Sequence, residues 1–170
     1  LGIIATIDNK EILIGNKKLL TKFNVQIDDI EEKLSAIFIA IDNKFDFAKE
    51  EKLQSDSYLS RIIIEEPNNL YNFSSVGYQT YYNSQEEIDL IDRLFFEAYR
   101  LGEVSNTIAI AEPVFRDADL VSLDLTSVKS SDSGNFESFV PNGFSGKEIC
   151  ALSRYAGISD KVTLFGIFNH

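Results

Sequence analysis

The sequence contains no methionine and no tryptophan, and it has one cysteine and one histidine among its 170 residues. The lone Cys150 excludes an internal disulfide, and such a cysteine is more typical of core packing than of a nucleophile. The single histidine is His170, so a transition-metal site elsewhere lacks its usual imidazole and thiolate ligands. Because methionine is absent even at position 1, we expect a piece of a longer chain or a processed one.

Positive charge is also scarce, since 16 Lys and Arg face 27 Asp and Glu, for a net charge of −11. This balance excludes a nucleic-acid footprint and attraction to anionic membrane surfaces. No apolar run is long enough to cross a bilayer, and no signal-peptide pattern opens the sequence. With 44% hydrophobic residues, the chain is expected to form a single domain over residues 1–170 in the reducing cytoplasm.

Strand-like and helix-like patterns alternate, which is typical of a largely parallel α/β sheet. Capping boxes at Ser84 and Ser145 predict two helices, one through Arg100 with Gly102 as its stop, the other ending near Gly157. Further helical or turn-like segments are expected at 28–34, 48–54 and 57–64. Strands are expected at 2–7, 11–14, 36–41, 76–82, 107–111, 120–123 and 162–168.

Four of the apolar runs end in polar clusters, and the carboxyl ends of parallel strands meet at one edge of a sheet. The clusters lie at Lys18, at Asp42 with Lys44 and Asp46, at Asp124 with Thr126, and at Asn169. The run before Asp124 opens into a long polar loop, as a functional loop does. The sequence therefore predicts a single site with three carboxylates and two ammonium groups.

The order and spacing of these clusters resemble the ureohydrolase family of arginases, agmatinases and formimidoylglutamases. Segments 15–18 (GNKK), 42–46 (DNKFD), 122–126 (SLDLT) and 167–169 (IFN) look like that family's metal-binding motifs. RLG at Arg100, EPVFRDAD at Glu112, PNGF at Pro141 and RYAGISDK at Arg154 look like the formimidoylglutamase-like branch of Bacteroidetes. The resemblance implies an arginase-like three-layer αβα fold with a mostly parallel sheet, of which this chain is a partial domain.

In the resembling family these motifs hold two manganese ions through histidines and carboxylates. Asp42, Asp46 and Asp124 match ligand positions, whereas four other positions are substituted, by Lys18, Lys44, Thr126 and Asn169. An ammonium group has no lone pair for a metal at pH 7 and repels one. We therefore hypothesise that Lys18 and Lys44 take the place and the electrostatic role of the two metals, leaving the three aspartates as vestigial ligands.

Without the metals, no residue here lowers the pKa of water enough to make the hydroxide nucleophile. The leading expectation is a catalytically silent ureohydrolase-like domain with no catalytic residues and no cofactor. It would bind a small amidine or amino acid in a pocket that includes Ser122 and Asn142, or assemble with itself or another protein. The alternative is a manganese-dependent hydrolase of a linear amidine such as N-formimidoyl-L-glutamate, with the metal held by the three aspartates and water.

A nucleotide-binding α/β module is a third reading. Neither GxGxxG nor GxxxxGK[ST] occurs in the sequence. Gly143 and Gly146 open a capped helix whose N-terminus could meet an anion, but a loop and an N-cap explain both glycines.

Overall fold

The computed structural model describes residues 2–7, 10–15, 36–47, 57–66, 68–135 and 139–169. The chain divides into two compact units, Leu1–Lys33 and Leu34–His170, which are taken separately below. The predicted helical or turn segments at 28–34 and 48–54 lie outside the described residues. The expectation of a single domain over the whole chain stays a prediction.

The first unit contains a two-stranded antiparallel sheet. Strand β1 (Gly2–Ile7) pairs with β2 (Lys10–Gly15), with Gly2 opposite Gly15. Both predicted strands are confirmed. The expectation that the second of them belongs to the parallel sheet is wrong, because β2 is paired antiparallel to its chain neighbour.

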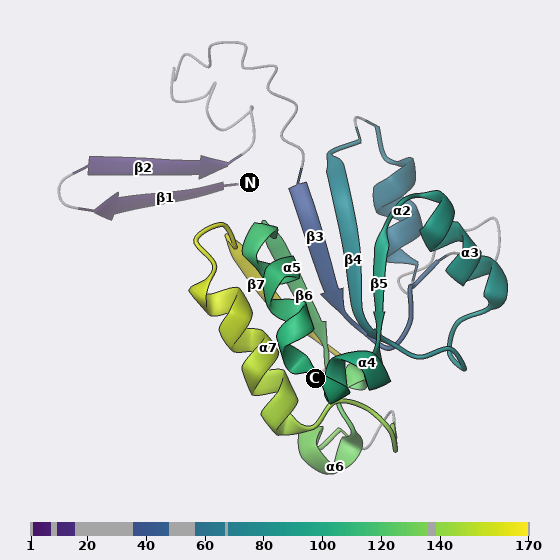
Figure 1. Cartoon of the computed structure of the whole chain (residues 1–170). Helices are drawn as coiled ribbons and strands as arrows, with labels where there is room; N and C mark the ends of the chain where they lie inside the picture. Colours follow the sequence, from purple (N-terminus) through teal and green to yellow (C-terminus); the bar gives the residue numbers. More distant parts are fainter. Residues whose placement is uncertain are drawn as a thin grey trace. The chain divides into compact units, whose positions relative to one another are not determined.

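The second unit is built on a five-stranded sheet with the order β5-β4-β3-β6-β7, and every neighbouring pair is parallel. Figure 1 shows the strands side by side between helices. The chain lays down β3, β4 and β5 towards one edge and then returns to place β6 and β7 on the other side of β3. The strands are β3 (Ala36–Ile41), β4 (Leu70–Tyr78), β5 (Glu97–Arg100), β6 (Leu120–Asp124) and β7 (Leu164–Phe168).

Helices cover both faces of this sheet, as Figure 1 shows, so the three-layer αβα arrangement is confirmed. One face carries α2 (Tyr58–Ile64) and α3 (Gln85–Arg93). The other carries α4 (Leu101–Asn106), the 3-10 helix η1 (Ile108–Ala111), α5 (Glu112–Asp117) and α7 (Gly146–Ile158). The loop after β6 contains a short 3-10 helix, η2 (Leu125–Ser127), and α6 (Ser130–Ser133).

Strand β3 shows why the sheet needs both helical layers. Its side chains alternate, with Ile39 and Ile41 in the core beneath α4, α5 and α7, and Phe38 and Ala40 in the core beneath α2 and α3. Ile39, Ala40 and Ile41 are all buried. A continuous apolar run is what a strand covered on both faces requires.

The two predicted capping boxes are confirmed. Ser84 accepts from the backbone N–H of Glu87, Ser145 accepts from that of Glu148, and each glutamate bonds back to the N–H of its serine. The second helix ends at Ile158, close to the predicted end.

The first capped helix is shorter than the sequence predicts. It ends at Arg93, and Phe95 has a φ of 58°, in the left-handed region that stops a helix. The segment Glu97–Arg100, predicted as helix, is strand β5, because it pairs with β4 and joins the sheet. Gly102 lies inside α4 and is not the helix stop.

Three other boundaries differ from the prediction. Strand β4 begins at Leu70 and ends at Tyr78, earlier than the predicted 76–82. The predicted strand at 107–111 is instead the 3-10 helix η1 over 108–111, and it is followed directly by helix α5, which has a proline in its first turn. Proline is favoured in the first turn of a helix, because the backbone N–H that it lacks would have no hydrogen-bond acceptor within the helix.

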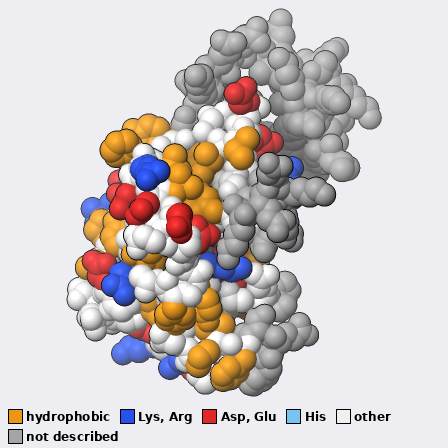
Figure 2. All heavy atoms as spheres, turned by 90° about the vertical axis from the view of Figure 1, so that its right-hand side faces the viewer, with side chains coloured by type: hydrophobic (Ala, Val, Ile, Leu, Met, Phe, Trp, Pro, Cys, Tyr) orange, Lys and Arg blue, Asp and Glu red, His pale blue; other side chains and the backbone are white. Residues whose placement is uncertain are grey.

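Several large hydrophobic side chains remain at the surface of this unit, among them Tyr71, Phe95 and Phe168, which are 73%, 90% and 54% exposed. Figure 2 shows hydrophobic patches separated by charged side chains on one face. A search of the described helices finds none with the length and hydropathy of a membrane span.

Candidate functional site

The site lies where the strand order reverses, between β3 and β6. These two strands are parallel neighbours, with Ile41 beside Leu123, so the residues that follow them emerge at the same edge. Asp42 directly follows β3, and Asp124 is the last residue of β6. In an open α/β sheet, the crevice beyond the carboxyl ends at such a reversal is the usual ligand site.

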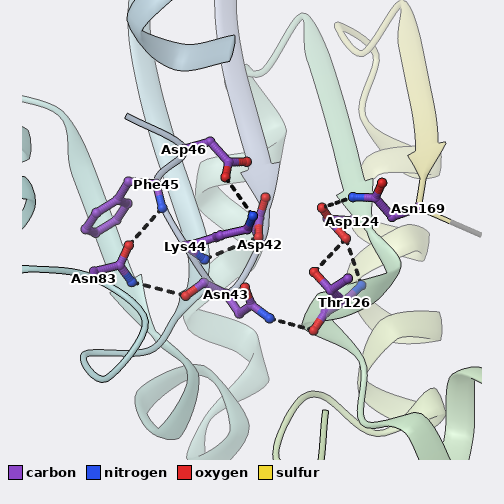
Figure 3. Close-up of polar contacts among 9 residues, drawn as sticks. All are labelled: Asp42, Asn43, Lys44, Phe45, Asp46, Asn83, Asp124, Thr126 and Asn169. Atoms are coloured by element: carbon purple, nitrogen blue, oxygen red, sulfur yellow. Dashed lines mark hydrogen bonds and ion pairs between the residues drawn. The ribbon is translucent and has the colours of Figure 1, made fainter. Parts of the chain in front are cut away.

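Asp124 is held by three donors from two residues (Figure 3). Its Oδ1 accepts from the backbone N–H of Thr126 at 2.7 Å and from the Thr126 hydroxyl at 2.7 Å. Its Oδ2 accepts from Nδ2 of Asn169 at 2.6 Å, across the end of β7. Both carboxylate oxygens of Asp124 are therefore occupied by neutral donors.

Lys44 contacts the other two aspartates. Its Nζ lies 3.1 Å from Oδ1 of Asp46, and its backbone N–H donates to Oδ1 of Asp42 at 3.2 Å. The side chain of Lys44 is 42% exposed whereas that of Asp46 is 7% exposed, so the ammonium group approaches the buried carboxylate from the solvent side.

Burial and mutual repulsion shift the titration of these groups. Burial raises the pKa of Asp42 well above its usual range, and the nearby charges of Asp46 and Asp124 raise it further. Burial also raises the pKa of Asp46, and it outweighs the opposing effect of Lys44. Burial lowers the pKa of Lys44, but attraction to Asp46 and then to the other aspartates exceeds that effect, so its pKa is raised.

Tyr58, at the start of α2, lies within electrostatic range of the three aspartates. Burial raises the pKa of its phenol well above the usual value, and the charge of Asp42 adds to this. The hydroxyl is buried and has no hydrogen-bond partner among the described residues. Tyr58 therefore keeps its proton beside the acidic cluster.

Two asparagines that the sequence analysis missed hold the loop after β3 in place. Nδ2 of Asn43 donates to the carbonyl oxygen of Thr126 at 2.6 Å and so joins the ends of β3 and β6. Asn83 accepts from the N–H of Phe45 at 2.9 Å and donates to the carbonyl oxygens of Asn43 and Gln79 at 3.1 Å and 2.8 Å. In the sequence, an asparagine in a polar segment before a capping box indicates only a turn.

Two residues of the site have unusual backbone conformations. Among the described residues, the non-glycine positions with positive φ are Asp46 at 53°, Asn169 at 57° and Phe95. Asp and Asn tolerate this region better than other residues. Such conformations cluster at functional sites, where surrounding contacts maintain them.

The structure brings together six of the predicted site residues and separates others. Lys18 lies outside the described residues, so its predicted place beside the aspartates is untested. Ser122 lies within β6 beside Ala40 and Gly166, whereas Asn142 lines a separate cavity described below. The six residues that share the crevice are Asp42, Lys44, Asp46, Asp124, Thr126 and Asn169.

These residues do not fit a pair of manganese ions as they are placed. Within the described part of the chain, no group of three or more His, Cys, Asp or Glu side chains is positioned to hold a metal. Asp124 already accepts hydrogen bonds on both oxygens, and Asp46 already has an ammonium partner. Carboxylate oxygens are the side-chain groups that suit manganese, and those of Asp46 and Asp124 already have these partners among the described residues.

No protein-family model and no curated protein matches the chain. Solved structures do match. Formiminoglutamase from Trypanosoma cruzi, solved with Mn²⁺, superposes with a TM-score of 0.69 at 18% identity, over 81% of this chain and 48% of that protein. Formimidoylglutamase from Bacillus subtilis gives a TM-score of 0.68 at 16% identity, over 78% and 44%. Agmatine ureohydrolase from Thermoplasma volcanium gives 0.61 at 18% identity, over 79% and 46%.

The chain has an arginase-like fold. This confirms the predicted fold class, and the predicted likeness to ureohydrolases is confirmed at the level of structure. At identities below one fifth the likeness shows the arginase-like fold alone. The chain spans about half the length of these solved structures.

Proposed function

We propose that this chain is an arginase-like domain that has lost its dimanganese site and acts as a non-catalytic binding or assembly protein. Three substituted positions, Lys44, Thr126 and Asn169, give their side chains to the aspartates as hydrogen-bond or ion-pair partners. This is the observation that carries the proposal. The substitutions form an ion pair on Asp46 and a neutral hydrogen-bonded network on Asp124, which together offset part of the charge that a metal pair would otherwise neutralise.

The chemistry of these partners explains why the domain would be silent. A manganese pair provides a Lewis acid and a hydroxide nucleophile at neutral pH. Lysine, threonine and asparagine side chains donate hydrogen bonds but supply neither. Asp42 and Asp46, with pKa values raised by burial, retain protons more readily than exposed carboxylates, yet an acid or base alone does not replace the missing Lewis acid.

We further propose that the chain belongs to the formimidoylglutamase-like branch, on the sequence segments from Arg100 onward, and that it works in the cytoplasm. Its ligand would be a small amidine or amino acid, and its partner another protein or a second copy of itself. Exposed apolar residues such as Tyr71 and Phe95 offer surface for such assembly.

The test is metal content and turnover together. Protein purified in the presence of MnCl₂ and desalted is analysed for bound manganese, and release of ammonia or formamide from N-formimidoyl-L-glutamate is followed. We expect substoichiometric metal and no release above the buffer blank. Two manganese ions per chain with turnover would overturn the proposal.

A second candidate, a manganese-dependent hydrolase of linear amidines, is favoured by one observation. Asp42, Asp46 and Asp124 are retained at the strand reversal, where a catalytic centre of an α/β sheet lies. Such an enzyme would have to displace Lys44 from Asp46 and Asn169 from Asp124. The Asp124→Asn variant separates the candidates by turnover, because it would abolish turnover in a manganese enzyme, whereas a silent domain has no turnover to lose.

A further inference from the structure

A cavity of about 360 Å³ lies beyond the carboxyl ends of β4 and β5, apart from the aspartate crevice. Its walls come from the turn after β4, the start of α4 and the loop before α7. The volume is within the range of small-molecule sites in proteins. Its polar and charged lining residues include Gln79, Tyr81, Arg100, Ser105 and Asn142.

The residues that line the cavity carry a positive net charge, whereas the chain as a whole is negatively charged. Ten residues line the cavity, and they include Arg100 but no aspartate or glutamate. The chain as a whole has 27 acidic residues in 170 and a net charge of −11. Among the described residues, the lining itself carries one positive charge and no negative charge, whereas Glu103 and Glu148 lie next to it, so the cavity suits an anion better than the surface around it does.

Arg100 is available to such a ligand. It is exposed and is the last residue of β5, and it makes no ion pair with any of the described residues. Its charge acts on the phenol of Tyr78, whose pKa burial raises and Arg100 lowers. The guanidinium group is therefore near the cavity and free to form charge-assisted hydrogen bonds.

Polar side chains opposite Arg100 are fixed in position. Nε2 of Gln79 donates to the carbonyl oxygen of Asn142 at 3.0 Å, and Nδ2 of Asn142 donates back to Oε1 of Gln79 at 2.9 Å. The hydroxyl of Tyr81 donates to the same oxygen of Gln79. Gln79 is only 4% exposed, so this amide pair joins two loops that are distant in sequence.

Two glycines allow the loop with Asn142 to lie where it does. A Cβ on Gly143 would lie 2.5 Å from the carbonyl oxygen of Ser127, and one on Gly77 would overlap the ring of Phe144. Phe144 is also bonded through its backbone, donating to the Ser127 oxygen at 2.9 Å and accepting from Lys129 at 3.1 Å. The cavity wall is thus preorganised, which favours ligand affinity.

We propose that this cavity binds a small organic carboxylate, with Arg100 as its charge partner and with a wall held in shape by the hydrogen bonds among Gln79, Tyr81 and Asn142. The proposal is independent of the loss of the metal site. It needs only that the cavity, Arg100 and the amide pair are as described.

The experiment measures thermal stabilisation and calorimetric binding of succinate and benzoate to the full chain, with sodium phosphate and sodium chloride at equal ionic strength. The test variant is Arg100→Gln. The matched control is Arg93→Gln, which removes the same charge from the exposed end of α3. Circular dichroism checks that both variants are folded.

We expect saturable binding of at least one carboxylate, weakened about tenfold or more by Arg100→Gln and unchanged by Arg93→Gln. The affinity should also fall as sodium chloride is raised. Binding of neither carboxylate, or equal loss in both variants, overturns the proposal. Equal binding of phosphate reassigns the cavity to anions in general and overturns the carboxylate assignment.

Discussion

Among single residues, Asp124 shows how neutral donors stabilise a buried carboxylate. Its three hydrogen bonds come from Thr126 and Asn169, both uncharged. Lys44 is bonded to Asp46 instead. The cluster is therefore divided into an ion pair on the β3 side and a neutral network on the β6 and β7 side.

The neutral network predicts a penalty for a second charge at position 169. Asn169→Asp would place a carboxylate against Oδ2 of Asp124, where the amide now donates at 2.6 Å, while keeping a residue that tolerates positive φ. We expect a loss of about 1–2 kcal/mol of unfolding free energy at pH 7 from like-charge repulsion. The loss should shrink at pH 4, where one carboxylate takes up a proton.

Urea unfolding at both pH values measures this loss. Asn68→Asp makes the same change on an exposed segment and should have little effect. An Asn169→Asp variant as stable as the parent at pH 7 would contradict the network as described.

At Asp42 we predict a gain of stability at pH 7, where the change at Asn169 predicts a loss. Burial, and then Asp46 and Asp124, raise its pKa in the folded state. The folded protein then binds this proton more tightly than the unfolded chain, so its stability falls as pH rises from the unfolded pKa towards the folded one. Asp42→Asn removes that fall while keeping an oxygen for the N–H of Lys44.

We therefore expect Asp42→Asn to stabilise the protein at pH 7, by an amount on the order of 1 kcal/mol. The gain should disappear below the unfolded pKa, where the aspartic acid of the parent is also neutral. Chemical denaturation from pH 4 to pH 8 follows the difference, with the exposed Glu66→Gln as control. A gain that grows as pH falls would contradict the raised pKa.

At the scale of elements, the sequence predicts the elements whose signals are local. The capping boxes at Ser84 and Ser145 and the apolar run of β3 are as expected. Segment 97–100 is different, because its residues suit a helix and only pairing with β4 makes it a strand. Segment 107–111 is β-rich in composition, yet its role is to pack as η1 against the core.

In the candidate site, too, the features with local sequence signals are predictable and those that depend on distant partners are not. Asp42, Asp46 and Asp124 are predictable, because each lies next to a recognisable buried strand. The bonds that Asn43 and Asn83 make to the backbone of distant loops are not, because no local pattern encodes a partner 38 or more residues away. Asp124 was predicted, but its partnership with Asn169 depends on β7 lying beside β6.

The carboxyl end of β4 depends on one glycine. Gly77 has a φ of 105°, and a Cβ there would overlap the ring of Phe144. Gly77→Ala is expected to lose about 2–4 kcal/mol, from backbone strain and displacement of a fully buried aromatic ring. The same change at Gly157, in α7 and with open space around it, should be neutral or stabilising by roughly 0.5–1 kcal/mol.

Thermal and urea unfolding of the two alanine variants make this comparison. Carboxylate binding to the cavity lined by Arg100 and Asn142 provides a second measurement. Displacement of Phe144 by Gly77→Ala would move Asn142 and weaken that binding. Equal stability of Gly77→Ala and Gly157→Ala would show that the loop before α7 is not held by this contact.

At the scale of the whole molecule, the net charge of −11 affects every metal-binding experiment. An acidic protein attracts any divalent cation weakly and without a defined site. A small effect of manganese alone therefore says nothing about the aspartate crevice. The informative quantity is the difference between manganese and magnesium at the same concentration.

The last prediction uses this difference to test the substitutions directly. For the parent chain we expect equal shifts in melting temperature with Mn²⁺ and Mg²⁺, because Lys44, Thr126 and Asn169 occupy the aspartates. The triple variant Lys44→His, Thr126→Asp, Asn169→Glu removes the ammonium group and adds an imidazole and two carboxylates, which are manganese ligands. It should be destabilised without metal by repulsion among its carboxylates, and its stability should recover selectively with manganese.

At a hundredfold excess over Kd, one bound ion adds about 2.7 kcal/mol to the free energy of unfolding, which raises the melting temperature by roughly 5–10 °C for a chain of this size. A manganese-selective shift of that size in the parent would mean that the three aspartates still hold metal, whereas the same shift confined to the triple variant would assign the loss to these substitutions.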